Sequence, residues 1–154
     1  QAQAAGVSPE RIVFAPRAKL TDHLARQPLA DLFLDTWPCN AHTTASDALW
    51  MGLPVITRVG RQFASRVAAS LLAASGLPQL IAADLAEYER KALALARDPA
   101  ERARLRQHLL GSRAHNPLFD AARTTRALEA LYRRMHERAR QGLPPDHLEA
   151  QADA

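Results

Sequence analysis

The sequence is poor in aromatic residues and contains a single cysteine. Phe, Trp and Tyr make up 5% of its 154 residues, so a hydrophobic core has to consist mainly of Leu, Ala, Val and Ile. Cys39 has no other cysteine to pair with, which argues against a disulfide-stabilised secreted scaffold and favours a reducing, cytoplasmic location. No segment approaches the roughly 20 consecutive apolar residues that cross a bilayer, and the N-terminus lacks a signal-peptide pattern, so we expect no membrane association.

Internal repeats are also missing, which argues against a solenoid. Hydrophobic residues account for 47% and charged residues for 23%, as in an ordinary globular protein, and the length suits one domain. The chain begins at Gln1 in what the pattern predicts to be a helix ending at Gly6. We therefore expect it to be part of a longer protein.

The net charge of +4 is concentrated toward the C-terminus, where residues 97–140 contain 11 basic and 5 acidic residues, against 9 and 11 elsewhere. A basic helical surface can bind RNA or an acidic partner. These arginines are not interleaved with the aromatic residues of a base-stacking surface. We interpret them as a solvated helix face and predict no nucleic-acid partner.

Short apolar runs alternate with longer helical patterns, which indicates βαβ units around a parallel sheet. Four strands are predicted, over residues 11–15, 31–35, 55–57 and 79–82. Helices are predicted over residues 21–27, 43–51, 64–75 and 84–97, followed by one opening at Asp98-Pro99 and one from Asp120 to about Gln141. Thr43 or Thr44 is the expected cap of the second helix, and Gly52 and Gly76 follow the ends of the second and third.

The predicted fold class is thus α/β, with a Rossmann-like parallel sheet flanked by helices and a C-terminal helical tail. We assign residues 1–97 to the core, residues 98–142 to helices that pack back on it, and residues 143–154 to a disordered tail.

In open α/β sheets ligands bind beyond the carboxyl ends of the strands, which directs attention to residues 35–47. A loop of small polar residues leads there into a predicted helix start, whose free N–H groups and positive dipole end suit a phosphate. His42, Thr43 and Thr44 can add donors to its oxygens. Asp47 lies about one turn further, where a carboxylate can accept from both hydroxyls of a ribose. An ordinary helix cap explains the same residues, so their spacing alone leaves both interpretations open.

Longer segments are more specific: DLFLDT at 31–36, CNAHTT at 39–44, DALW at 47–50 and ASRVAAS at 64–70, with RIVF at 11–14, PLF at 117–119 and LEALY at 128–132. In this order and spacing they resemble the UDP-binding half of the protein O-linked N-acetylglucosamine transferase family, over residues 11–137. The resemblance implies a pair of Rossmann-like domains with the donor between them. The chain is then the C-terminal half of a GT-B glycosyltransferase, with C-terminal helices that cross back to the missing N-terminal half.

The resemblance also implies roles at the base end of the site. Ala18 meets the uracil through its backbone, His23 packs on the base, and Arg26 supports that end of the site. Where the family has a lysine three residues before the stacking histidine, this sequence has Leu20. Either Lys19, one place earlier, makes that contact or the contact is missing.

At the other end, the resemblance implies that His42, Thr43 and Thr44 hold the diphosphate and that Asp47 takes the ribose. His42 is the candidate catalytic residue, because it stabilises the departing diphosphate. The implied reaction is inverting transfer of N-acetylglucosamine from UDP-N-acetylglucosamine to protein Ser or Thr hydroxyls, with no metal or other cofactor.

The implied partners are the N-terminal half of the same enzyme, which carries helical repeats in this family, a nucleotide sugar, and a protein or peptide acceptor. We expect the chain alone to be inactive. Two alternatives stay open: a related transferase using UDP-glucose or GDP-fucose, and a catalytically silent nucleotide- or RNA-binding regulatory module.

Other chemistry is disfavoured. A Cys39–His42 nucleophile has no third group to orient the histidine. A metal site built from Cys39, His23, His42 and Asp47 has no recognised ligand spacing, so no metal site is predicted.

Overall fold

The computed structural model describes residues 1–150. Its sheet has three parallel strands in the order β1 (Phe33–Leu34), β2 (Val55–Arg58) and β3 (Ile81–Ala82). Phe33 pairs with Val55, and Thr57 pairs with Ile81. The predicted α/β class is confirmed, with all carboxyl ends of the strands at one edge of the sheet.

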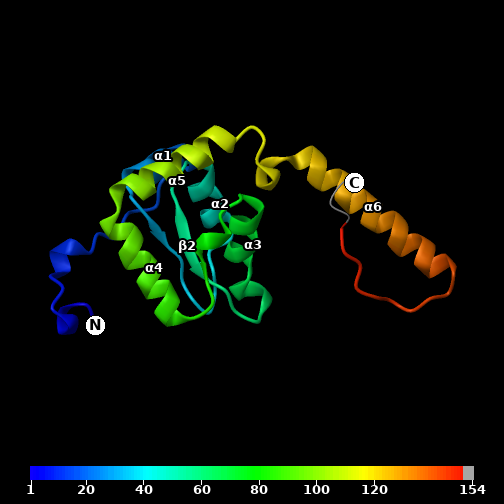
Figure 1. Ribbon diagram of the computed structural model, residues 1–154, viewed down its shortest axis with the longest axis horizontal. Helices are drawn as coiled ribbons and strands as arrows, with labels where there is room; N and C mark the ends of the chain where they lie inside the picture. Colours follow the sequence, from blue (N-terminus) through cyan, green and yellow to red (C-terminus); the bar gives the residue numbers. More distant parts are fainter. Residues whose placement is uncertain (151–154) are drawn as a thin grey trace.

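Helices cover both faces of this sheet. α2 (Thr43–Trp50) and α3 (Val67–Ala74) lie on one side of β2, α4 (Leu85–Arg97) lies on the other, and α5 (Pro99–Ser112) crosses between α4 and α2 (Figure 1). The remaining elements are α1 (Leu20–Arg26), α6 (Ala121–Arg140) and six 3₁₀ turns: η1 (Gln3–Ala5), η2 (Pro9–Arg11), η3 (Gln27–Leu29), η4 (Phe63–Ser65), η5 (Pro78–Leu80) and η6 (Pro117–Phe119).

The core between these layers is aliphatic, as the scarcity of aromatic residues requires. Leucines from every layer meet in it: Leu49 and Leu53 around the end of α2, Leu72 of α3, Leu95 of α4, and Leu105 and Leu109 of α5. Each is less than a tenth exposed, so the hydrophobic effect holds the helices on the sheet.

Aspartates open the last three helices, as predicted. Asp84, Asp98 and Asp120 each accept a hydrogen bond from the backbone N–H three residues further on, at 2.8, 2.9 and 2.8 Å. Gly52 and Gly76 follow α2 and α3 with φ of +77° and +71°, a left-handed conformation that glycine adopts without steric cost.

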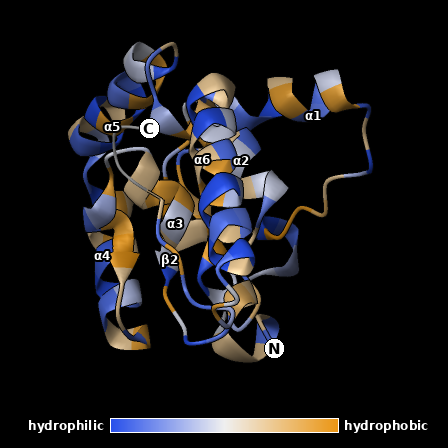
Figure 2. Ribbon diagram, turned by 90° about the vertical axis from the view of Figure 1, so that its right-hand side faces the viewer, coloured by the Kyte–Doolittle hydropathy of each residue, from blue (hydrophilic) through white to orange (hydrophobic). Residues whose placement is uncertain are grey.

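The predicted strand over residues 11–15 is wrong. Ile12, Val13 and Phe14 lie in an unpaired segment and are 41%, 85% and 90% exposed. Within residues 1–150 no strand runs beside them, so no ladder of backbone hydrogen bonds forms. Figure 2 shows this segment and α1 standing out from the rest of the domain.

The predicted helix over residues 64–75 is interrupted at its start. η4 covers Phe63–Ser65, and Arg66, with φ −122° and ψ −13°, separates it from α3. The resulting turn projects beside the carboxyl edge of the sheet.

α6 projects away from the sheet, and residues 143–150 run back beside it (Figure 1). It has no buried residue, whereas α5 buries Leu105 and Leu109. Arg138 holds the returning segment by donating to the carbonyl of Pro144 at 2.6 Å.

The domain boundaries stay predictions, and residues 151–154 of the predicted disordered tail lie outside the described residues. None of the helices in residues 1–150 combines the length and the apolarity needed to cross a membrane.

Candidate functional site

A buried carboxylate organises the loop between β1 and α2. Asp35 directly follows β1 and is 7% exposed. Its Oδ1 accepts from the backbone N–H groups of Thr36 and Ala41, at 2.8 and 2.7 Å, and its Oδ2 accepts from the hydroxyl of Thr57 at 2.6 Å. These bonds fix both ends of the loop to the neighbouring strand.

Three further hydrogen bonds hold this loop. The Tyr88 hydroxyl donates to the carbonyl of Asp35 at 2.9 Å, and burial, followed by the charge of Asp35, raises the pKa of Tyr88 above its ordinary value. The Asn40 backbone N–H donates to the carbonyl of Ala64 at 2.8 Å, and its side chain donates to Thr36 O at 2.9 Å. We did not anticipate Asp35 or Tyr88 as parts of the site, although an aspartate at the end of a predicted strand is a detectable signal.

The loop leads into α2, whose N-terminal end is not capped by a side chain of the described residues. His42 occupies the N-cap of α2, and no side chain in residues 1–150 caps the helix. The prediction that Thr43 or Thr44 caps it is wrong: both are exposed, and no described hydrogen bond uses either hydroxyl. The first N–H groups of an α-helix lack intrahelical partners, so this tip presents free donors at its positive end.

Two side chains flank this tip. The ring of His42 meets the edge of Phe63 with centroids 5.9 Å apart, which restricts the orientation of the imidazole. Asp47 lies four residues after Thr43, on the same face of α2. It is half-buried, and its side chain forms no hydrogen bond or ion pair within residues 1–150, so its carboxylate can accept from a ligand.

The predicted base-binding residues form a second group, around α1. Arg26 donates to His23 Nδ1 at 2.8 Å and to the carbonyl of Pro16 at 2.9 Å. Because a guanidinium can only donate, Nδ1 of His23 accepts in this contact. Ala18 and Lys19 are exposed in the segment that Arg26 ties down, and the Lys19 carbonyl accepts from the backbone N–H of His23 at 2.8 Å.

The structure therefore gathers the candidate residues into two clusters: Ala18, Lys19, His23 and Arg26 at α1, and His42, Thr43, Thr44 and Asp47 at α2. No hydrogen bond, ion pair or ring contact in the described residues joins one cluster to the other. Their roles toward a ligand stay predictions.

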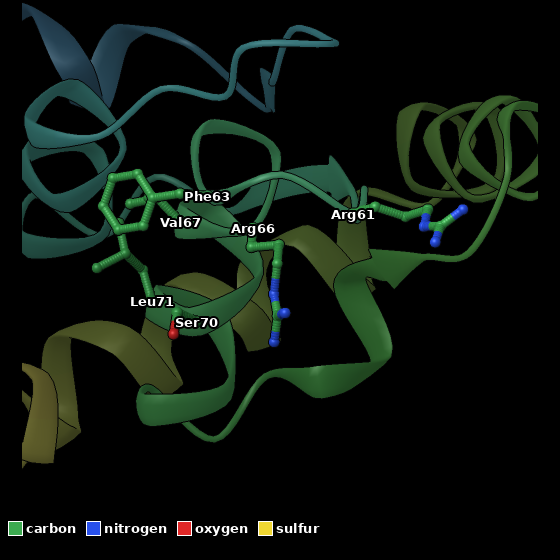
Figure 3. Close-up of a pocket in the computed structure, with 6 residues that line it drawn as sticks. All are labelled: Arg61, Phe63, Arg66, Val67, Ser70 and Leu71. Carbon is green, nitrogen blue, oxygen red and sulfur yellow. The ribbon is translucent and has the colours of Figure 1, made fainter. Parts of the chain in front are cut away.

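A pocket of about 500 Å³ lies beside η4. Phe63, Val67 and Leu71 form its apolar side, while Arg66 and Arg61 extend away from them (Figure 3). Phe63 is 79% exposed although its ring contacts His42, so the pocket adjoins the α2 tip. No group of three or more His, Cys, Asp or Glu side chains within residues 1–150 could hold a metal ion.

Comparison with known proteins identifies the family. The model of glycosyl transferase family 41 matches residues 1–128. The chain belongs to this family. Among curated family 41 proteins, it is 42% identical over 147 residues to the probable UDP-N-acetylglucosamine–peptide N-acetylglucosaminyltransferase SEC of Arabidopsis thaliana, covering 95% of this chain and 15% of the relative.

The corresponding enzyme of Caenorhabditis elegans is 40% identical over 143 residues, which cover 93% of this chain and 12% of that protein. A solved structure of a mutant O-GlcNAc transferase from Thermobaculum terrenum superposes with a TM-score of 0.79 at 40% identity, covering 86% of this chain and 26% of that one. The chain thus spans less than a sixth of the length of these two curated relatives, and the resemblance found in its sequence is confirmed.

Proposed function

We propose that this chain is the donor-nucleotide-binding part of an inverting glycosyltransferase that moves N-acetylglucosamine from UDP-N-acetylglucosamine to Ser or Thr hydroxyls of proteins. The observation that carries the proposal is the tip of α2 in a chain of glycosyl transferase family 41. Within residues 1–150 no side chain caps this tip, and the flanking carboxylate of Asp47 has no partner. The names of its relatives support the donor and the peptide acceptor.

The proposed chemistry is stabilisation of the leaving group. As the bond to the sugar breaks, negative charge accumulates on the UDP diphosphate. The N–H groups at the α2 tip, the hydroxyls of Thr43 and Thr44, and the His42 ring donate to these oxygens, while Asp47 accepts from the ribose hydroxyls. Because Asp35 and Phe63 hold the loop and the ring in place, little reorganisation accompanies the reaction.

At the base end, we propose that uracil stacks on His23 and bonds the backbone of Ala18. Arg26 already holds the His23 ring, which supports a preformed platform. The exposed Lys19 side chain forms no hydrogen bond or ion pair in residues 1–150 and is available to a phosphate. No metal takes part in this proposal.

The remaining groups belong to the rest of the enzyme in this proposal. An N-terminal half supplies the sugar pocket, most of the acceptor groove and any general base, and helical repeats bind the protein substrate. The setting is cytoplasmic, consistent with the free thiol of Cys39.

The test is calorimetric titration of the full-length protein with UDP. Replacing Asp47→Ala removes the acceptor for the ribose hydroxyls, and we expect affinity to fall about tenfold to a hundredfold, as for loss of one or two hydrogen bonds to a charged group. Glu89→Ala is the matched control, because Glu89 is an exposed carboxylate of α4 without a described partner, on the other side of β2 from α2, and should leave UDP affinity unchanged.

Equal UDP affinity in both variants would contradict the assignment of Asp47. Tighter binding of GDP than of UDP would favour a GDP-sugar transferase. Salt-sensitive RNA binding without UDP affinity would instead support a regulatory module that uses the basic C-terminal helices.

A further inference from the structure

A second pocket, of about 700 Å³, opens at the carboxyl edge of the sheet. The segments that follow all three strands line it: Trp37 and Pro38 after β1, Arg58 to Gly60 at and after the end of β2, and Ala83 after β3. Ligands of open α/β sheets bind at this edge, and the volume lies in the range of small-ligand pockets. We call it the Trp37–Arg58 pocket.

This pocket borders the candidate diphosphate site through one short turn. Ser65 of η4 and the preceding Gln62 line the pocket, while Phe63 of the same turn contacts His42. In Figure 3 Arg61 is directed away from Phe63, Val67 and Leu71, and it is also one of the residues lining the Trp37–Arg58 pocket. A molecule reacting at the α2 tip therefore has this pocket within reach.

Positive charge in the pocket is uncompensated. The Arg58 guanidinium lies over the Trp37 ring, 4.2 Å from its centroid, and its Nε is buried without a hydrogen-bond partner. Arg61 is exposed and forms no ion pair within residues 1–150, and no carboxylate lines the pocket. Elsewhere arginines do find such partners: Arg102 pairs with Asp31 and Arg104 with Glu101.

The wall of the pocket is closely packed around Gly60. The Gly60 N–H donates to the carbonyl of Ser65 at 2.7 Å, and a Cβ on Gly60 would lie 2.3 Å from Ser65 Oγ and 3.3 Å from Trp37 Nε1. Only glycine fits there. The cation–π contact with Trp37 restrains the Arg58 guanidinium, whose fork of donors matches a carboxylate.

We propose that the Trp37–Arg58 pocket binds the carboxylate of an aspartate or glutamate of the acceptor peptide near its target hydroxyl. This inference rests on the proposed function. In that function the α2 tip already neutralises the diphosphate, and N-acetylglucosamine carries no charge. The anion that matches Arg58 and Arg61 must then come from the acceptor.

The experiment uses the full-length protein and peptides in which one aspartate is moved along the sequence around the target serine, each matched by its asparagine counterpart. At one position the aspartate peptide should show a KM about tenfold lower than its counterpart, as expected for charge-assisted hydrogen bonds. Arg61→Gln should reduce this ratio, and Arg58→Gln with Arg61→Gln should bring it to about one.

Arg113→Gln is the matched control. Arg113 also stacks on a tryptophan, Trp50, at 4.8 Å, and its Nε is also buried without a partner. Trp50 ends α2, about 11 Å from the tip at 1.5 Å per residue, so this substitution should keep the preference for aspartate.

Because Arg61 is exposed, its variant tests the proposal even if Arg58→Gln destabilises the fold. Equal KM values for every peptide pair, or a preference that survives Arg61→Gln undiminished, would overturn the proposal. UDP affinity, measured in parallel, distinguishes failure of the pocket proposal from failure of the proposed function. Intact UDP binding and transfer without a preference for aspartate would overturn the pocket proposal alone. Absence of both UDP binding and transfer would overturn the transferase assignment as well.

Discussion

Asp35 shows how a residue without ligand contacts can decide the geometry of a site. Its two carboxylate oxygens accept from both ends of the loop and from Thr57 of the next strand, and all three bonds are 2.8 Å or shorter. A buried anion is stable only when it is satisfied in this way. The position of His42 at the α2 tip follows from this arrangement.

We expect Asp35→Ala to lower the free energy of unfolding by about 3 kcal/mol, because two backbone N–H groups lose a charged acceptor at about 1–3 kcal/mol each. Urea denaturation of the purified chain measures this loss. Asp35→Asn keeps one oxygen that can accept from the two N–H groups, so it should lower the free energy of unfolding by less than half as much as Asp35→Ala. Equal losses in the two variants would show that the charge, rather than the number of acceptors, matters.

The sequence predicted site residues only where they lie close together in the chain. His42, Thr43, Thr44 and Asp47 lie within six residues of one another and share one helix start, so a pattern could find them. The contacts of His42 with Phe63 and of Asp35 with Thr57 join residues about 20 positions apart. Such contacts depend on how the helices and strands pack, which no spacing rule encodes.

At the scale of elements, Gly52 joins α2 to β2 under two constraints. Its φ of +77° disfavours a side chain, and a Cβ would lie 2.8 Å from Cγ and Cδ2 of Leu110 on α5. Gly76 after α3 has a similar φ of +71°, but a Cβ there would meet only His108, at an ordinary distance of 3.6 Å.

Comparing alanine at the two glycines separates these constraints. Gly76→Ala should destabilise the chain by about 1 kcal/mol through its backbone conformation. Gly52→Ala should lower the free energy of unfolding by at least about 1 kcal/mol more than Gly76→Ala, because overpacking against Leu110 adds to the effect of the backbone conformation. Thermal or urea unfolding gives both values. A loss at Gly52 no larger than at Gly76 would mean that Leu110 moves aside freely.

Element boundaries followed from sequence where side chains act on their own backbone. Asp84, Asp98 and Asp120 cap helices through bonds three residues away, which is why the pattern located them. The strand predicted at residues 11–15 failed for the opposite reason. Its apolar residues favour extended structure, but a strand exists only when a neighbour supplies the ladder.

At the scale of the whole molecule, α6 and the segment before α1 stand apart from the sheet (Figure 1). α6 buries no residue, and Leu128, Tyr132 and Met135 are 44%, 62% and 54% exposed. In the proposed enzyme these parts contact the other half, which also closes the donor cleft.

It follows that residues 1–154, expressed alone, should not transfer N-acetylglucosamine from UDP-N-acetylglucosamine to a peptide. In the proposed function the chain contributes contacts to the nucleotide but leaves the sugar and most of the acceptor to the other half, and positioning supplies much of the rate enhancement in group transfer. A radiolabelled-donor assay beside the full-length protein tests this. Transfer by the isolated chain at a rate comparable to that of the full-length protein would contradict the proposal that the other half is required for transfer.

The sequence by itself determined the α/β class, most helix limits and the family, because these depend on local hydrogen bonds, on hydrophobic periodicity and on motifs contiguous in the chain. The tertiary structure alone decided that the α2 tip is left uncapped, that Asp35 ties the loop to β2, and that Arg58 lies over Trp37 with no carboxylate among the described residues that line their pocket. These features arise where separate segments meet at one sheet edge, and their energies depend on distances that only packing sets.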